Sequence, residues 1–226
     1  MTEEKRQIVI PGEIIISGDE YLPGEGTEKK GKDIIALRYG LSEEQNLLVK
    51  IIPLSGTYLP RRGNVVIGRV EEITFNGWVI NIDTPERAFL SLMEIPRYVN
   101  KDALDEVMDV GDMVVAKIWS INKRGIDLSV KMRGFGKIND GLIVNVNPNK
   151  VPRIIGKEGS MISLIKEKTG CNITVGQNGL IWIEGKKIAD ELLAKKAVLF
   201  IVEKSFVLGL TEEVTKWFEE GKKWQY

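Results

Sequence analysis

The chain has 226 residues, of which 43% are hydrophobic, and its 32 basic and 32 acidic side chains give a formal net charge of +0. Because it has no histidine and a single cysteine, it cannot form a His-ligated metal site, a zinc ribbon, a Ser-His or Cys-His catalytic pair, or an intramolecular disulfide. No apolar run approaches the roughly 20 residues that span a bilayer, and the polar N-terminus has no secretory pattern. We therefore expect a cytoplasmic protein with no cofactor and with Cys171 buried as a small hydrophobe.

Residues 1–62 are predicted to form a small β domain followed by a linker. Short apolar runs bounded by Gly, Pro and Asp indicate strands. They lie at 8–10, 14–16, 33–38 and 47–52. The polar stretch 17–32 between them is expected to be an exposed loop, and the proline-containing stretch 53–62 is expected to be the connector.

Residues 63–135 have the pattern of a five-stranded barrel. The expected strands are 65–71, 77–82, 87–92, 113–119 and 125–130. A short helical or irregular stretch is expected at 100–107, between the third and fourth strands. Five strands with a short helix in that place is the plan of an OB-fold.

Residues 136–226 change to a mixed pattern. A strand at 141–146 precedes the loop Gly156-Lys157-Glu158-Gly159, and a helix at 160–168 follows and stops at Gly170. Strands at 172–175 and 180–184 are joined through Asn178-Gly179, a strong hairpin signal, and a long helix is expected at 188–203. With helices on both sides of the glycine loop, the order is β-α-α-β-β-α, which resembles a type I KH domain.

A short C-terminal helix is predicted to complete this domain. Thr211 is expected to cap it, and Lys222 and Lys223 are expected in its last turn. Val214, Trp217 and Phe218 would share one face and dock on the domain.

The glycine loop is the first candidate RNA-binding site, because KH domains clamp the backbone of single-stranded nucleic acid with such a loop. The loop backbone and the N-terminus of the following helix would contact phosphates, basic residues would add charge, and Ile154-Ile155 would form an apolar floor for bases. The candidate residues are Arg153, Ile154, Ile155, Gly156, Lys157, Gly159 and Ser160. Glu158 opposes this function with its negative charge, and a Gly-x-x-Gly taken alone is usually just a turn.

The charge distribution agrees with local contact to nucleic acid. Residues 137–204 carry eleven Lys/Arg and seven Asp/Glu, a balance of +4, so the rest of the chain carries −4. A basic module attached to acidic ones fits an RNA-binding segment. Chance clustering on a solvated surface would also produce a difference of this size.

The second candidate site lies in the barrel, where Phe75-Asn76-Gly77-Trp78 resembles the Phe-Gly-x-Phe stretch of S1-type RNA-binding domains. In that family both aromatics stack on bases, so Phe75 and Trp78 are the candidates, with burial in the barrel core as the alternative. The family's histidine falls on Ser91 and its arginine on Gly125, although Arg124 is adjacent. Candidate phosphate contacts are Lys117, Lys123 and Arg124, each of which could equally be a solvated surface charge.

Taken together, the chain resembles the S1/KH-type RNA-binding cap subunit of the archaeal exosome. The stretches that carry this resemblance are 9–13, 58–68, 151–162 and 175–183. The resemblance implies a non-catalytic subunit that binds single-stranded RNA. Three such cap subunits would sit on a hexameric ring of RNase-PH-like subunits, dock through the N-terminal β domain, and guide RNA into the pore for phosphorolytic 3′-to-5′ degradation.

Two alternatives remain at this stage. One is a free-standing RNA-binding protein or RNA chaperone built from the same modules. The other is a carboxylate-based nuclease, for which the support is a cluster of acidic residues at the helical or loop spacing typical of a solvated face. Its members are Asp102, Asp105, Glu106, Asp109 and Asp112.

Overall fold

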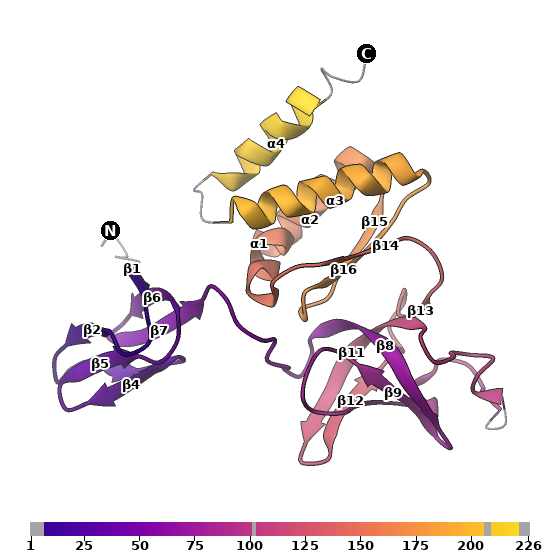
Figure 1. The fold of residues 1–226 in the computed structure, drawn as a ribbon, viewed down its shortest axis with the longest axis horizontal. Coiled ribbons are helices and arrows are strands. Elements are labelled where there is room, and N and C mark those ends of the chain that lie inside the picture. The colour runs from indigo at the N-terminus through magenta and orange to yellow at the C-terminus, as the bar shows by residue number, and fades with distance from the viewer. Residues whose placement is uncertain (1–6, 101–102, 206–208, 222–226) are drawn as a thin grey trace. The chain divides into compact units, whose positions relative to one another are not determined.

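The computed structural model describes residues 7–100, 103–205 and 209–221. The chain divides into two compact units, Met1–Gly56 and Thr57–Tyr226, and each is described by itself (Figure 1). The second unit holds two separate hydrophobic cores, one inside a β-barrel and one under the helices of a mixed module. The fold class is therefore α+β with several modules, as the sequence predicts. No helix in the described ranges is long and apolar enough to cross a membrane.

The first unit consists of two small sheets. The first sheet contains β1 (Gln7–Val9), β6 (Gly40–Gln45), β7 (Leu48–Pro53) and β3 (Leu22–Pro23), in that order. The second contains β2 (Ile14–Ser17), β5 (Asp33–Ala36) and β4 (Thr27–Lys30), in that order. Val9, Ala36 and Ile51 are buried together in a small core.

The expectation of an exposed loop at 17–32 is wrong, because β3 and β4 lie within it, and β6 was not predicted at all. β4 is an edge strand of mostly polar residues that pairs with β5 alone. Its one buried residue, Thr27, donates its hydroxyl to the Val49 carbonyl at 2.9 Å. Backbone pairing holds such a strand, so hydropathy gives no signal for it.

The barrel begins the second unit. Its strands are β8 (Val65–Thr74), β9 (Gly77–Asn81), β10 (Ala88–Ser91), β11 (Met113–Asn122), β12 (Gly125–Ser129) and β13 (Gly136–Ile138). They run in the order β12-β10-β9-β8-β11-β13, and pairing between β11 and β12 closes the barrel. The five predicted strands are present, while β13 is an addition that lengthens the sheet beside β11. Residues 101–102 of the predicted irregular stretch lie outside the described residues.

A KH-like module follows the barrel. Its sheet has the order β14 (Leu142–Asn145), β16 (Leu180–Glu184), β15 (Asn172–Val175). The helices α1 (Val151–Ile155), α2 (Ser160–Thr169) and α3 (Ile188–Glu203) pack on this sheet (Figure 1). The predicted order β-α-α-β-β-α is confirmed. Cys171 is buried in this core, as expected, and burial raises the pKa of its thiol.

Helix α4 (Leu210–Gly221) packs beside α3. Val214 and Phe218 are buried and Trp217 stacks on Phe200 with ring centroids 5.6 Å apart, so the predicted docking face is confirmed. The predicted cap is wrong, because the helix already begins at Leu210 and Thr211 lies within its first turn. Lys222 and Lys223 lie outside the described residues.

The hairpin between β15 and β16 joins the KH-like module to the barrel. At its turn, Gln177 donates its backbone N–H to the Val65 carbonyl at 2.8 Å and accepts from the Val65 N–H through Oε1 at 2.6 Å. Asn178, only 3% exposed, accepts from the Ile67 N–H and donates to the carbonyls of Ile67 and Ile82. The turn thus completes the part of the β8 edge that β9 does not reach, and it ties the two modules together.

Candidate nucleic-acid interface

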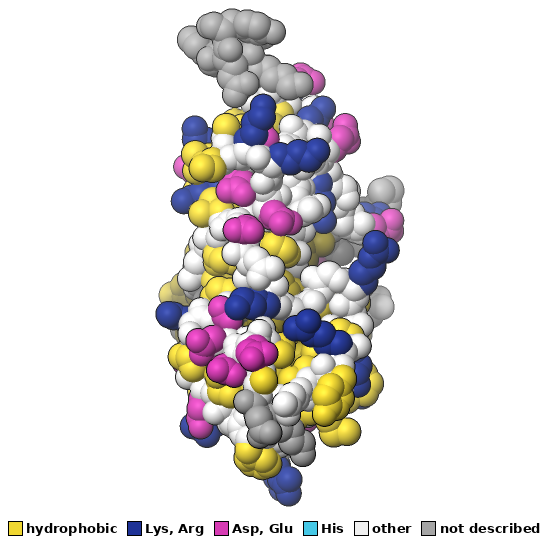
Figure 2. Space-filling view, turned by 90° about the vertical axis from the view of Figure 1, so that its right-hand side faces the viewer, with side chains coloured by type: hydrophobic (Ala, Val, Ile, Leu, Met, Phe, Trp, Pro, Cys, Tyr) yellow, Lys and Arg dark blue, Asp and Glu magenta, His cyan; other side chains and the backbone are white. Residues whose placement is uncertain are grey.

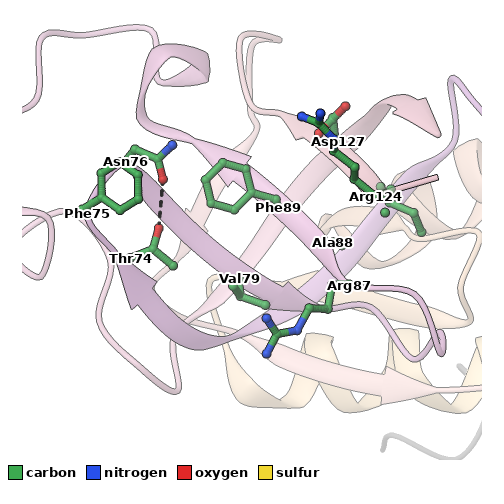
Figure 3. A pocket seen from close by; sticks show the side chains of 11 residues that line it. Thr74, Phe75, Asn76, Val79, Arg87, Ala88, Phe89, Arg124 and Asp127 are labelled. Carbon is green, nitrogen blue, oxygen red and sulfur yellow. Dashed lines mark hydrogen bonds between the residues drawn. The ribbon is translucent and has the colours of Figure 1, made fainter. Parts of the chain in front are cut away.

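A shallow pocket of about 360 Å³ opens on the outer face of the barrel. Phe75, which is 84% exposed, and Phe89, which is partly exposed, contribute the two rings of its lining. In Figure 3, Phe89 lies between Phe75 at one end and Arg87 and Arg124 at the other. The remaining lining residues are Thr74, Asn76, Val79, Ala88, Gly125, Ile126 and Asp127. Exposed rings with flanking guanidinium groups can hold a stacked base and its phosphate.

Strand alternation explains why these side chains share one face. Phe89 pairs with Val79 on one neighbouring strand and with Asp127 on the other, and all three point outward. The residues on either side of Phe89 in the sequence, Ala88 and Leu90, have side chains fully buried in the barrel core. At Gly77, a Cβ atom would lie 2.9 Å from Cζ of Phe89 and would collide with the Leu90 carbonyl. This glycine therefore lets the Phe89 ring lie close over the backbone that follows Phe75.

The prediction that Trp78 stacks on bases is wrong. Its side chain is 0% exposed in the barrel core, and its Nε1–H donates to the Met108 carbonyl at 2.8 Å. Trp78 is on the inward register of β9 together with Ile80, so it faces away from the pocket. The outward aromatic is Phe89, which sequence reasoning missed. The available signal was its position between the inward residues Ala88 and Leu90.

The three candidate basic residues of the barrel do not form one cluster. Arg124 lines the pocket, as proposed from the sequence, and Lys123 is exposed beside it in the turn between β11 and β12. Lys117 is half-buried on β11, opposite Val65 and Ser129, and does not line the pocket. Ser91, where the family's histidine falls, instead caps a 3₁₀ turn by accepting from the Met93 N–H.

The glycine loop of the KH-like module is held by its backbone conformation. Gly156 has φ 75°, and a Cβ there would lie 2.7 Å from both the amide nitrogen and the Cβ of Met161. Glu158 and Gly159 also have positive φ, 53° and 81°. Because of these turns, α2 begins directly after the loop, and no side chain caps its N-terminus. The Ser160 N–H donates to the Lys157 carbonyl, and the helix dipole favours an anion at this end of α2.

The side chains around this loop divide into exposed and buried ones. Arg153, Lys157 and Ser160 are exposed, and Ile155 is partly exposed. Ile154 is 0% exposed in the core, so its predicted part in an apolar floor for bases is wrong. The physical reason is helical: Val151 and Ile154 lie one turn apart on α1 and share its buried face.

Charge is mixed over the surface. On the face in Figure 2, Lys and Arg side chains are interspersed with Asp and Glu. In the barrel, a hydrogen bond from Lys137 lowers the pKa of Asp112, and that of Glu94 is lowered by hydrogen bonds from Ser129 and Lys131 that outweigh its desolvation. Each of these two carboxylates is therefore held in an ion pair with a lysine side chain. Within the described ranges no group of three or more Asp, Glu, Cys or His could hold a metal ion.

The fold and the two surfaces define a class: a multidomain protein that combines an OB-fold barrel with a KH domain. The KH domain family model matches residues 141–189. The chain is 39% identical to the exosome complex component Rrp4 of Methanobrevibacter smithii, over 93% of this chain and 70% of the relative. It is 37% identical to Rrp4 of Thermococcus kodakarensis, over 92% of this chain and 83% of the relative.

A solved structure agrees with these relatives. A crystal structure of a protein provisionally named as an exosome complex RNA-binding protein aligns with a TM-score of 0.67 and 35% identity, over 76% of this chain and all of that one. The chain belongs to the family of the archaeal exosome component Rrp4. The resemblance seen in its sequence is thereby confirmed.

Proposed function

We propose that this chain is a non-catalytic RNA-binding subunit of an archaeal exosome, working in the cytoplasm. It binds single-stranded RNA and guides the strand into the pore of a hexameric ring of RNase-PH-like subunits, on which three copies sit. The ring performs the phosphorolytic 3′-to-5′ degradation, which the bound subunit makes more efficient. The observation that carries the proposal is the exposed Phe75–Phe89 pocket on the barrel of a chain from this family.

RNA binding is supported by two surfaces of different kinds. The barrel offers aromatic rings with Arg87 and Arg124 beside them. The KH loop offers the positive end of the α2 dipole, with Arg153 and Lys157 exposed nearby. Neither surface has a strong excess of positive charge, so each contact is expected to be modest. Several copies around one pore would raise the effective concentration of binding sites and compensate for weak single contacts.

Docking on the ring is supported by a row of apolar side chains that the first unit exposes. In the β1-β6-β7 sheet, Ile8 pairs with Leu41, and Leu41 pairs with Ile52, which gives a row of apolar side chains across three strands. Ile8 is 55% exposed and Ile52 is 38% exposed, while their neighbours Val9 and Ile51 form the core on the opposite face. A contiguous exposed apolar row of this kind is typical of a protein–protein interface.

The test is assembly with the ring. Ile8→Lys combined with Ile52→Lys should abolish co-elution with purified ring subunits in size-exclusion chromatography, because two charges would be buried against the partner. RNA binding by the chain itself should remain. Ile188→Lys, the same change at a 75% exposed position of α3, is the control.

Removal of residues 1–56 should have the same effect as the double substitution. Undisturbed co-elution of either variant would contradict docking through this unit, and RNA binding without any ring association would favour a free-standing RNA-binding protein.

A further inference from the structure

Trp119 is a large aromatic side chain that the proposed pocket does not use. It is 57% exposed, and the guanidinium carbon of Arg62 lies 5.4 Å from its ring centroid. A bulge interrupts the β11–β12 pairing here: Ile118 pairs with Leu128 and Ser120 with Asp127, which leaves Trp119 as the extra residue. Ile118 is buried in the barrel, so Trp119 stands on the outer face. An exposed tryptophan held under a guanidinium group is a surface on which a base can stack.

The strand register connects Trp119 to the pocket. A lateral row of paired residues crosses the outer face from Val79 to Phe89, then to Asp127 and Ser120. Ser120 donates its hydroxyl to Asp127, which lines the pocket. Ser120 is therefore two strand spacings, about 10 Å, from Phe89 along this row, and Trp119 is the next residue.

On its other side, Trp119 is connected to the KH domain through β8. Lys117, two residues earlier on the same outward face, pairs with Val65 of β8. Val65 in turn exchanges two hydrogen bonds with Gln177 in the turn that joins the KH domain to the barrel. Trp119 thus lies between the aromatic pocket and the KH junction, and its cationic neighbours are Arg62 and Lys117.

We propose that the Arg62–Trp119 pair is a second base-stacking platform, which receives a nucleotide of a single-stranded RNA that leaves the Phe75–Phe89 pocket toward the KH domain. This inference rests on the proposed RNA binding. The ring face not covered by Arg62 would take the base, and the guanidinium group, fixed by its contact with the ring, would pair with the adjacent phosphate. Continuity with the pocket and the positive neighbours favour a polyanionic strand over a protein partner.

The experiment compares full-length variants in fluorescence anisotropy with an oligoadenylate of about 16 nucleotides, the upper end of an OB-fold site. Trp119→Leu keeps an apolar side chain but removes the stacking ring, and should weaken binding about five- to a hundredfold. Trp119→Phe should stay within about threefold of the unmodified chain because it keeps a ring. With an adenosine dinucleotide, which is too short for its two bases to reach both platforms at once, Trp119→Leu should bind the Phe75–Phe89 pocket like the unmodified chain.

Tyr98→Leu is the matched control, because Tyr98 is a 93% exposed aromatic of the same barrel that does not line the pocket. Unchanged binding of the long oligonucleotide to a folded Trp119→Leu variant, with weakened binding to a Phe75→Ala/Phe89→Ala variant, would overturn the platform and leave the proposed function intact. Loss of ring association with RNA binding unchanged would assign Trp119 to a protein contact instead. Absence of RNA binding by the unmodified chain would refute both proposals.

Discussion

The outer face of the barrel and the glycine loop of the KH domain would hold the same kind of strand through different parts of the chain. On the barrel, two phenylalanine side chains would form the binding surface, and Phe75 is 84% exposed. In the loop, the backbone would form it: Gly156 and Gly159 have positive φ, and no side chain caps the N-terminus of α2. The barrel surface therefore depends on which side chains are present, whereas the loop depends on a conformation and on nearby charge.

This difference has energetic consequences. Stacking on an aromatic ring contributes about 1–3 kcal/mol per base and is tolerant of sequence. Contacts between phosphates and charged groups weaken as salt is added, because the release of condensed counterions into a more concentrated solution is less favourable. The barrel should therefore supply most of the affinity at high salt, and the loop should supply the salt-dependent part.

The largest effect on RNA affinity is expected from substitutions in the barrel pocket. Phe75→Ala combined with Phe89→Ala should weaken RNA binding by about 2–6 kcal/mol if each ring holds one base, with little change in the salt dependence. Folding should be preserved, because neither ring belongs to the buried core. Anisotropy titrations at several salt concentrations measure both quantities. Tyr98→Ala, outside the pocket, is the matched control and should bind normally. Equal affinity of the double variant and the unmodified chain would remove the barrel pocket from the interface.

A smaller change in free energy is expected from a substitution at the junction between the KH domain and the barrel. Asn178→Ala removes three hydrogen bonds to the barrel, with Ile67 N–H at 3.2 Å and with the carbonyls of Ile67 and Ile82 at 2.7 and 3.3 Å. Buried backbone groups of β8 would lose their partners, so the free energy of unfolding should fall by about 2–3 kcal/mol. Chemical denaturation followed by circular dichroism checks this.

The same junction variant sharpens the comparison between the two surfaces. If they bind one strand together, a loosened junction should weaken binding of a long oligonucleotide that touches both, and leave binding of a short one unchanged. Asn172→Ala is the control, because Asn172 is an exposed asparagine at the other end of the same hairpin, bonded only at 3.3 Å to Glu184. It should change stability by less than about 0.5 kcal/mol. If both variants lose similar affinity for the long oligonucleotide, substitution anywhere in the hairpin weakens binding, and the contacts of Asn178 with the barrel have no separate role.

The sequence predicts the loop better than the barrel face, for a physical reason. The bounds of β15, β16 and α3 agree with the prediction, because alternating apolar residues, the Asn178-Gly179 turn and a helical period are local signals. The glycine loop is likewise a local motif. The barrel pocket is assembled by register between strands far apart in the chain. Alternation along β10 could show that Phe89 points outward, but only the pairing of β9, β10 and β12 shows which residues lie beside it.

The errors also have local and non-local causes. Trp78 belongs to the alternating set Trp78, Ile80 and Ile82, all fully buried, so strict attention to period would have placed it in the core. The expectation for Ile154 fails because Ile154-Ile155 does not form one apolar strip: adjacent residues point in different directions on a helix. The missed strands β4 and β6, by contrast, have polar sequences that only backbone pairing organises.

The smallest effect on RNA affinity is expected from substitutions in the glycine loop of the KH domain. Lys157→Asp combined with Glu158→Asp replaces one positive charge by a negative one while leaving the fold intact, because both side chains are exposed and Asp tolerates the positive φ of Glu158. RNA binding at low salt should weaken about three- to tenfold, and the slope of log affinity against log salt should fall by about 0.7 for the lost phosphate contact. The deficit should shrink as salt is raised, because exposed charges are then screened.

A matched control lies at the other end of the same helix. Lys166 and Glu167 repeat the Lys-Glu pair on α2 and are also exposed, so Lys166→Asp with Glu167→Asp makes the same charge change away from the loop. If this control weakens binding as much as the loop variant does, the effect is one of net charge and not of contact at the loop. If the loop variant binds like the unmodified chain at an unchanged melting temperature, the KH loop is not an RNA contact. The strand would then be held by the aromatic face of the barrel, and the KH domain would serve chiefly to cover the edge of β8.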